Sequence, residues 1–435
     1  MTADGNGEVI GEAAPKGRPV AEALPVGLPL APLSPSAASE ALLRRAMLVV
    51  AIGLSSVLGY FTTFALLAIA LAVFAFFALR RATVTIPFDL PAKLFLGAFT
   101  LLFISAVVTM RQPSDLLQTL NFSAMLLYAP LALLFRRAAG PANSRKLADF
   151  ALFGSAAGLL MALYFNYVEG MQRAGLGSPI TDPIRLSNTA LLLGFFAMIG
   201  AAAATGRQRF IYLLGPLMAL AVIFASGSRA ALVAFPVLLF VAAVLLVRHK
   251  LLAAAVSVAV LAGFGLIAYF ADLAGARSSS MFDILSRLAG GDNPADLGTT
   301  IRFILYRAGA QAFTDAPLFG HGWGQLMTAI VPYLAVYELV HAELPHLHND
   351  ALNFAVASGL FGLVVYLLLL VLPVLSCIFS PHDSQYRTRL YGCSLLSVSY
   401  LVLGLPDTML SFPLHNTLYV VLTAVLLNYC RDERA

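Results

Sequence analysis

Long apolar stretches separated by short polar segments dominate the chain. A helix needs about 20 mostly apolar residues to cross a bilayer, and twelve stretches reach or approach that length. They lie at 42–58, 60–79, 93–110, 116–135, 147–168, 187–205, 210–225, 229–247, 251–271, 351–376, 388–405 and 411–430. The first two run together, and Ser55-Ser56 or Gly59-Tyr60 is the natural place for a turn between them. The pattern predicts an all-α polytopic membrane protein with about twelve transmembrane helices.

Composition agrees with a membrane protein. Hydrophobic residues make up 60% of the chain and charged residues 11%, against roughly 25% charged in soluble domains. A soluble fold of this size could not cover so much apolar surface, whereas lipid can solvate it. No arginine-rich face with interleaved aromatic residues is present, so we expect no nucleic-acid partner. The three cysteines show no CxxC spacing, which argues against a metal site or a disulfide framework built on them.

The distribution of basic residues predicts the orientation. With twelve spans both termini lie on one side, and assigning that side to the cytoplasm places every lysine and most arginines there. Eight arginines fall on the outer side: Arg111, Arg173, Arg185, Arg229, Arg277, Arg287, Arg302 and Arg307. The orientation rule disfavours arginine outside, which favours a binding role for some of them.

The same pattern divides the chain into segments. Residues 1–41 are rich in Ala, Pro, Gly and Glu and lack the charged start and long apolar core of a signal peptide, so they predict a disordered cytoplasmic tail. Nine spans occupy 42–271 and three more occupy 351–430. The long loop 272–350 lies between these two groups, and 431–435 form a short cytoplasmic tail.

The loop 272–350 has the composition of an ordered domain. Loops without structure rarely exceed about 15 residues unless they are functional or disordered. Residues 299–314 place apolar side chains at helical spacing, 317–324 (PLFGHGWG) form a glycine-rich turn, and 333–346 carry aromatic residues, acids and histidines. We therefore expect an extracytoplasmic cap that contains one or two helices.

Candidate chemistry lies where this loop re-enters the membrane. Residues 345–362 (PHLHNDALNFAVASGLFG) place His346, His348, Asn349 and Asp350 at the rim of a span. Imidazole is the usual general base near neutral pH, and Asn349 could orient it or bind a sugar. The two histidines have no Cys or Asp at ligand spacing beside them, so we expect no metal site.

Four motifs resemble one family. His348-Asn349 followed after nine residues by GLFG at 359–362 is similar to the His-Asn-x9-Gly-x-x-Gly pattern of the O-antigen ligase and O-antigen polymerase superfamily. The 317–324 turn resembles its Pro-Leu-x-Gly-x-Gly element, SGSRAAL at 226–232 its Ser-x-Ser-Arg element, and TIRFILYRA at 300–308 its Arg-x-x-x-aromatic helix. The likeness covers roughly residues 180–365, in the same order; Leu363 departs, where a small polar residue often follows the second glycine.

The resemblance implies a reaction and a place for it. Members of that superfamily transfer a polysaccharide from undecaprenyl diphosphate to a hydroxyl group at the periplasmic face of the bacterial inner membrane. The family is regarded as inverting and metal-independent and needs no cofactor. Two arginines and one histidine are held to be essential in it, and by motif these correspond to Arg229, Arg302 and His348.

Physical chemistry suits these residue types. A leaving diphosphate develops negative charge, and the planar, always charged guanidinium grips phosphate oxygens through two hydrogen bonds. His348 would then activate the acceptor hydroxyl, since no carboxylate pair of the glycosidase kind stands beside it. We expect further substrate contacts from five residues, although helix capping or a surface position is the ordinary role of each type. They are Arg185, Asn188, Asn349, His346 and Arg307.

The preferred interpretation is an O-antigen ligase, whose partners are the undecaprenyl-diphosphate-linked donor, the lipid A-core acceptor and membrane lipids. A polymerase that joins lipid-linked repeat units shares every motif. A protein O-oligosaccharyltransferase is a third alternative, although such proteins commonly carry an extra C-terminal region. A transporter is the fourth, and the scarcity of ionisable residues within the spans argues against it.

Overall fold

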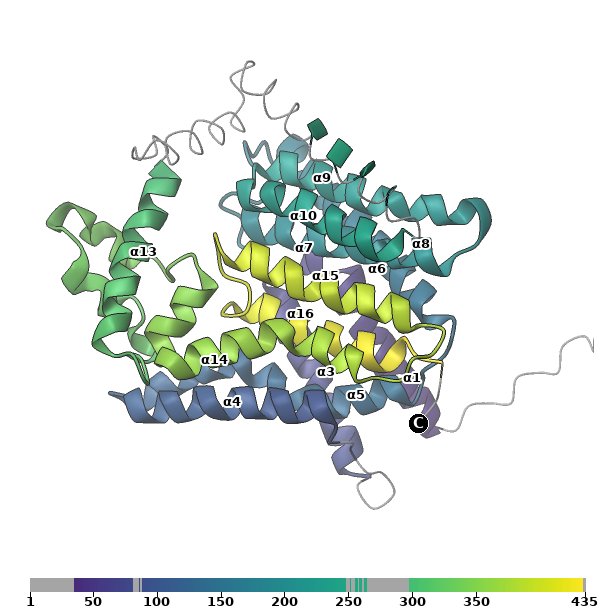
Figure 1. Ribbon diagram of the computed structural model, residues 1–435, viewed down its shortest axis with the longest axis horizontal. Helices are drawn as coiled ribbons and strands as arrows, with labels where there is room; N and C mark the ends of the chain where they lie inside the picture. The colour runs from purple at the N-terminus through teal and green to yellow at the C-terminus, as the bar shows by residue number, and fades with distance from the viewer. Residues whose placement is uncertain are drawn as a thin grey trace, which may run out of the picture. The chain divides into compact units, whose positions relative to one another are not determined.

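A computed structural model describes residues 35–80, 86, 88–247, 251, 255–256, 258–259, 262–263 and 297–432. The chain divides into two compact units, Met1–Ser39 and Glu40–Ala435, and the spans, the cap and the site all lie in the second unit. Throughout the residues just given, every regular element is a helix and none is a strand (Figure 1). The predicted all-α fold is therefore confirmed. The predicted tail up to residue 34, most of the span at 251–271 and the loop up to residue 296 lie outside the described residues.

Eight helices are long and apolar enough to cross a membrane, counted over the described part of the chain. They are Phe61–Ala78 (α3), Leu90–Thr109 (α4), Pro113–Arg136 (η2 and α5), Asn143–Val168 (α6 and η3), Pro183–Ala203 (α7 and α8), Gly206–Ser226 (η4 and α9), Arg229–Leu246 (α10) and Asp350–Ile378 (α14). The chain is thus a polytopic membrane protein. The count of twelve stays a prediction.

Helices outside this set of eight occupy three of the other predicted spans. They are α1 (Pro35–Leu48), η1 (Val49–Gly53), α2 (Ser55–Leu58), α15 (Tyr386–Gly404), α16 (Pro413–Ala424) and η9 (Val425–Tyr429). Helix α1 begins inside the segment that the sequence assigned to the tail. The chain turns at Gly59, where φ is 51° and a Cβ atom would lie 2.1 Å from the carbonyl oxygen of Ile180. Only glycine fits this close approach.

Helices α7 and α16 are central in the bundle. Every residue of α16 from Leu414 onward is buried, and so are all but one of α7, whereas only about one third of the residues of α3 and α4 are buried. A helix that is buried all round must find protein partners for its polar side chains. The polar residues at the start of α7 and α16 are therefore held within the protein.

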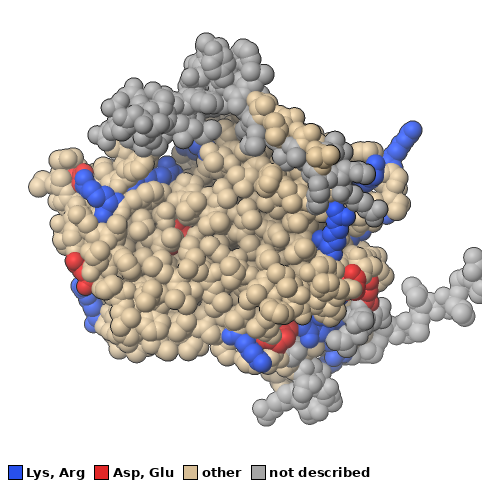
Figure 2. All heavy atoms as spheres, in the orientation of Figure 1, with Lys and Arg blue, Asp and Glu red and all other residues tan. Residues whose placement is uncertain are grey.

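Charged side chains gather toward two ends of the visible face, and a wide region of uncharged residues lies between them (Figure 2). One end carries the cap helices. The other carries two arginine–aspartate pairs, Arg136 with Asp89 and the fully buried Arg389 with Asp383 at 2.7 Å. This distribution is typical of a protein whose middle is solvated by lipid.

The described part of the predicted cap has a small core of its own. It contains α13 (Leu297–Asp315), which matches the helix predicted at 299–314, and the 3-10 helices η6 (Trp323–Gln325), η7 (Thr328–Tyr333) and η8 (Val336–Glu343). Their buried side chains pack on the start of α14, beside which α13 lies in Figure 1. The core residues include Leu305, Ala308, Ala312, Leu326, Ile330, Leu347 and Val356.

The two glycine motifs fold against each other. Helix α14 breaks at Gly359, where φ is 61° and ψ is −144°. The carbonyl groups that the break leaves unpaired accept hydrogen bonds from the 317–324 turn, with His321 N 2.8 Å from Val356 O and Gly322 N 2.9 Å from Ala357 O. A Cβ atom on Gly359 would lie 2.4 Å from the carbonyl oxygen of Leu318. The kink therefore fixes the turn against the membrane helix that follows His348.

Candidate functional site

The connection between α15 and α16, residues 405–412, is held by the first residue of α14. Asp350 is fully buried, and its carboxylate accepts hydrogen bonds from the backbone N–H groups of Met409 at 2.9 Å, Leu410 at 2.7 Å and Ser411 at 3.0 Å. The Ser411 hydroxyl donates a fourth at 2.6 Å. Charge-assisted bonds of this number fix the 405–412 segment to the start of α14.

Two more polar side chains connect the 405–412 segment to the residues around His348. Asn349 caps α14 by accepting from Leu352 N at 2.9 Å, and its Nδ2 donates to Leu405 O at 2.9 Å. The Tyr306 hydroxyl of α13 lies 2.8 Å from His348 O and 3.0 Å from Leu405 O. Burial raises the pKa of Tyr306 to about 12, so it stays a neutral donor.

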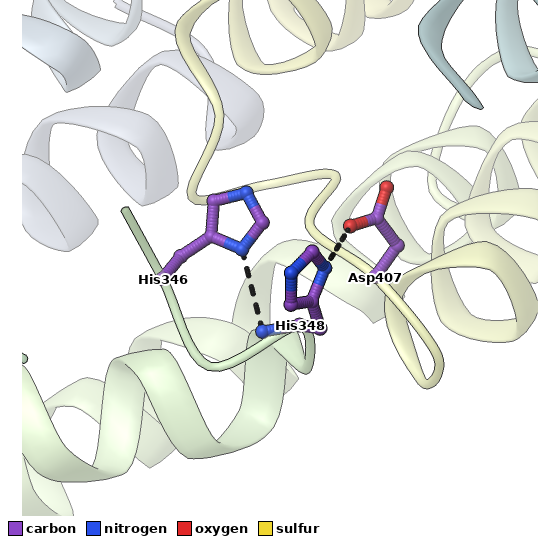
Figure 3. A group of neighbouring side chains, drawn as sticks. All are labelled: His346, His348 and Asp407. Carbon is purple, nitrogen blue, oxygen red and sulfur yellow. Dashed lines mark hydrogen bonds and ion pairs between the residues drawn. The ribbon is translucent and has the colours of Figure 1, made fainter. Parts of the chain in front are cut away.

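His348 has an unusual backbone. Its φ is 52°, the only positive value for a non-glycine residue in the described chain. Such a conformation costs on the order of 1–3 kcal/mol and persists only where neighbouring contacts enforce it. Its Nδ1 atom lies 3.1 Å from Asp407 Oδ1 of the 405–412 segment (Figure 3). One fifth of the side chain remains exposed, since its relative accessibility is 21%.

Asp407 is the centre of the arrangement. Its other oxygen, Oδ2, accepts a hydrogen bond from Arg185 Nη1 at 2.8 Å, and both side chains are almost fully buried. Burial alone would raise the pKa of Asp407, but the Arg185 charge and the bond to His348 outweigh it and hold the pKa well below its usual range. Asp407 is therefore ionised at every physiological pH.

Arg185 makes further contacts inside the protein. Nη1 also donates to Thr408 O at 2.6 Å and Nη2 to Thr408 Oγ1 at 2.7 Å, and the guanidinium lies 3.9 Å from the centre of the Phe412 ring. Asp182 at the start of α7 lies 3.7 Å from its Nε. Arg185 thus fixes Asp407 and the segment around it.

This geometry determines which nitrogen of the His348 ring carries the proton. A carboxylate opposite Nδ1 favours the tautomer that carries its proton there, so Nε2 keeps a lone pair that can accept a proton. The same carboxylate stabilises the imidazolium that forms. The His348–Asp407 pair can therefore act as a general base.

Arg302 reaches the same segment from α13. Its Nε donates to Pro406 O at 2.9 Å and its Nη1 to Gly298 O at 3.2 Å, and the side chain is partly exposed. Arg302, Arg185 and His348, which are far apart in the sequence, thus meet at residues 406–408. Arg302 and His348 therefore bind consecutive residues of one segment, Pro406 and Asp407, and a guanidinium is suited to bind an anionic group.

Arg229 lies on a second turn, the connection between α9 and α10. It is the first residue of α10 and partly buried, and it follows Gly227, whose φ of 62° ends α9. Arg173 donates from Nε to Ser226 O at 2.8 Å on the same turn. Two arginines and a helix N-terminus therefore gather at this turn, which is a favourable place for an anion.

Two other predicted substrate contacts bind protein groups. Arg307 Nη2 donates to Glu338 Oε2 at 2.7 Å within the cap. Asn188 is fully buried in α7, and its Nδ2 lies 3.5 Å from Met409 Sδ. A substrate role for either side chain stays a prediction.

His346 lies against His348. The ring centres are 4.4 Å apart, and His346 Nδ1 accepts a hydrogen bond from His348 N at 3.3 Å. Burial lowers the pKa of His346 to about 3, and the neighbouring His348 contributes in the same direction. A neutral His346 can therefore support the strained backbone of His348.

The same three side chains form a group that could hold a metal ion. His346, His348 and Asp407 each offer one ligand atom, all within 4.8 Å of one another (Figure 3). The third ligand could not be predicted from spacing in the sequence, because Asp407 lies 59 positions after His348. Arg185 already occupies one Asp407 oxygen, and its positive charge opposes a second cation there.

Sequence reasoning missed two residues of this site, Asp407 and Tyr306, and it placed Asp350 at the membrane rim without giving it a role. The two acids carried a usable signal, since each lies at the end of an apolar span, where ionisable residues are rare and functional. Tyr306 carried none, because aromatic residues are common on helices of this kind.

Comparison with known proteins agrees with the motifs. Residues 214–367 match the family model described as O-antigen ligase. The matched region contains Arg229, Arg302 and His348, whereas Arg185 and Asp407 lie outside it. No curated protein matches the chain.

Proposed function

We propose that this chain, a member of the O-antigen ligase and O-antigen polymerase superfamily, is the ligase that transfers a polysaccharide from undecaprenyl diphosphate to a hydroxyl group of lipid A-core. Members of the family are glycosyltransferase-like enzymes. The observation that carries the proposal is the His348–Asp407 pair at 3.1 Å, held beside Arg302 by the 405–412 segment.

In the proposed reaction His348 Nε2 takes the proton of the acceptor hydroxyl as its oxygen attacks the anomeric carbon. The new carbon–oxygen bond forms on the face opposite the bond that breaks, so the configuration inverts. The electron pair of the broken bond leaves with the lipid diphosphate. Asp407 stays ionised and stabilises the imidazolium.

Arginine supplies the charge that the leaving group requires. Arg302 and Arg229 are the proposed contacts of the diphosphate, since both are partly exposed, Arg302 on α13 against Pro406 and Arg229 at the start of α10. Arg185 takes a different part in this proposal, because its donors bind Asp407 and Thr408. It keeps Asp407 ionised and in place.

The remaining parts of the proposal follow from the family. The site faces the periplasm, and the protein lies in the bacterial inner membrane, where a lipid-linked donor can enter sideways from the bilayer. The reaction needs no metal ion, because guanidinium groups neutralise the diphosphate.

The test uses purified protein in liposomes, a defined undecaprenyl-diphosphate-linked glycan and two acceptors offered separately, lipid A-core and a lipid-linked repeat unit. The proposal predicts transfer to lipid A-core, unchanged by a chelator, and loss of that transfer in His348→Ala. The matched control is His382→Ala. It removes an exposed histidine next to Asp383, which pairs with Arg389 at the other end of the bundle. Transfer only to the repeat unit would identify a polymerase instead, and transfer to a protein acceptor an O-oligosaccharyltransferase.

A further inference from the structure

Helix η8 (Val336–Glu343) has an inverted pattern. Glu338 faces inward and is 3% exposed, whereas the apolar Val336 is 87%, Tyr337 82% and Val340 61% exposed. The second acid, Glu343 at the end of the helix, is exposed. A segment that faces water shows the opposite order. Contact with an apolar environment would therefore stabilise the outer face of η8.

Two hydrogen bonds hold the inward Glu338, so the pattern is enforced by the fold. Glu338 Oε2 accepts hydrogen bonds from Arg307 Nη2 at 2.7 Å and from Ala335 N at 2.9 Å. Leu334, just before the helix, packs in the cap core beside Ile330. These contacts fix the rotation of η8 and leave its apolar side chains on the outside.

Lipid is the occupant that the neighbouring surface indicates. The 317–324 turn of the cap meets the last turn of α4, where Ser105 Oγ donates to Phe319 O at 2.8 Å and a Cβ on Gly322 would lie 3.0 Å from Thr109 Oγ1. Helix α4 still presents apolar side chains at this level, with Val108 57% and Met110 45% exposed.

The 317–324 turn and the part of α14 that it contacts also carry exposed apolar side chains. Leu318 in the turn is 51% exposed, and Leu360, just after the kink in α14, is 52% exposed. The cap therefore begins at the depth where two spans still face lipid. Tyrosine beside aliphatic residues is also the composition that bilayer interfaces favour.

We propose that the outer face of η8, formed by Val336, Tyr337 and Val340, lies in the interfacial layer of the lipid bilayer and anchors the cap to the membrane surface. The segment lies on the membrane and does not span it, as amphipathic interfacial segments do. This inference does not depend on the proposed reaction.

The test places a nitroxide spin label at Tyr337→Cys in the full-length chain in phosphatidylcholine liposomes. The native cysteines Cys377, Cys393 and Cys430 are buried and so resist labelling. Collision with molecular oxygen, which concentrates in lipid, is compared with collision with a water-soluble nickel chelate. Val340→Cys serves as a second site, and Gln311→Cys, on an exposed polar position of α13, is the matched control.

The proposal expects oxygen to relax the label at 337 and 340 more than nickel does, and the reverse at 311. Stronger relaxation by nickel at 337 and 340 would show that the face is in water and would overturn the proposal. An immobile label that neither reagent reaches would show that protein covers the face, for example a second copy of the chain, and would also overturn it.

Discussion

Replacing Asp407 with Asn removes one charge and leaves the shape of the side chain nearly unchanged. Arg185, whose side chain is 4% exposed, then loses its buried counter-ion and keeps only the more distant Asp182, 3.7 Å from its Nε. Breaking a buried ion pair by removing one partner typically costs about 3–5 kcal/mol. Arg185 keeps both bonds to Thr408, so we expect a loss near the lower end, about 3 kcal/mol.

The same change should act separately on the rate. An amide at position 407 can donate to His348 Nδ1, which moves the imidazole proton to Nε2 and removes the lone pair that accepts the substrate proton. General base catalysis contributes about 10²- to 10⁴-fold, so kcat for glycan transfer should fall by that factor, with little change in KM.

The assay measures kcat in liposomes at a temperature where the variant is folded, and thermal unfolding in detergent gives the stability. The matched control is Asp383→Asn, which breaks a similar buried pair with Arg389 at the other end of the bundle. It should lose stability and keep kcat. A tenfold difference in kcat corresponds to only about 1.4 kcal/mol in the barrier. If Asp407→Asn keeps kcat within about tenfold of the unmodified protein, the assignment of the proton to Nδ1 and of the accepting lone pair to Nε2 of His348 is wrong.

Three further changes probe other parts of the structure. Gly359→Ala should destabilise the protein by about 3 kcal/mol, because the new Cβ meets the Leu318 carbonyl at 2.4 Å on a positive-φ backbone; an unchanged melting temperature would contradict the kink. His346 has a pKa of about 3 when folded and near 6.5 when unfolded, so its contribution to stability is full above about pH 6.5 and is lost as the pH falls toward 3; His346→Phe should flatten that part of the pH–stability curve, and an equal slope in both proteins would refute the assignment. Arg307→Ala should lower the free energy of unfolding by about 1 kcal/mol, because it leaves Glu338 buried with one donor fewer while Arg307 itself is mostly exposed. Differential scanning calorimetry of the variant checks this, and a gain in stability would contradict a stabilising Arg307–Glu338 pair.

The elements that follow from periodicity were predictable. The apolar stretches at 93–110 and 229–247 correspond to α4 and α10 within a few residues, and helical spacing at 299–314 located α13. Glycine motifs were also informative, because GLFG and the 317–324 turn need positive φ and close backbone approach where the structure has them.

The site itself was predictable only in part. His348 and Arg302 carried motif signals, but Asp407 lies in a different helix connection, and its approach to His348 depends on how α14, α15 and α16 pack. Arg185 was expected to contact substrate, which stays a prediction, but its bonds to Asp407 and Thr408 depend on the burial of α7 and could not be predicted. Spacing along a sequence does not report which buried faces meet.

The central claim is that His348, held by Asp407, takes a proton from the acceptor during glycan transfer. The most direct measurement is single-turnover transfer from a defined undecaprenyl-diphosphate-linked glycan to lipid A-core, comparing the unmodified protein, His348→Ala and His382→Ala at equal amounts of folded protein in liposomes. The account predicts product with the unmodified protein and His382→Ala, and a loss of about 10²-fold or more with His348→Ala. Transfer by His348→Ala at a rate close to that of the unmodified protein would contradict it.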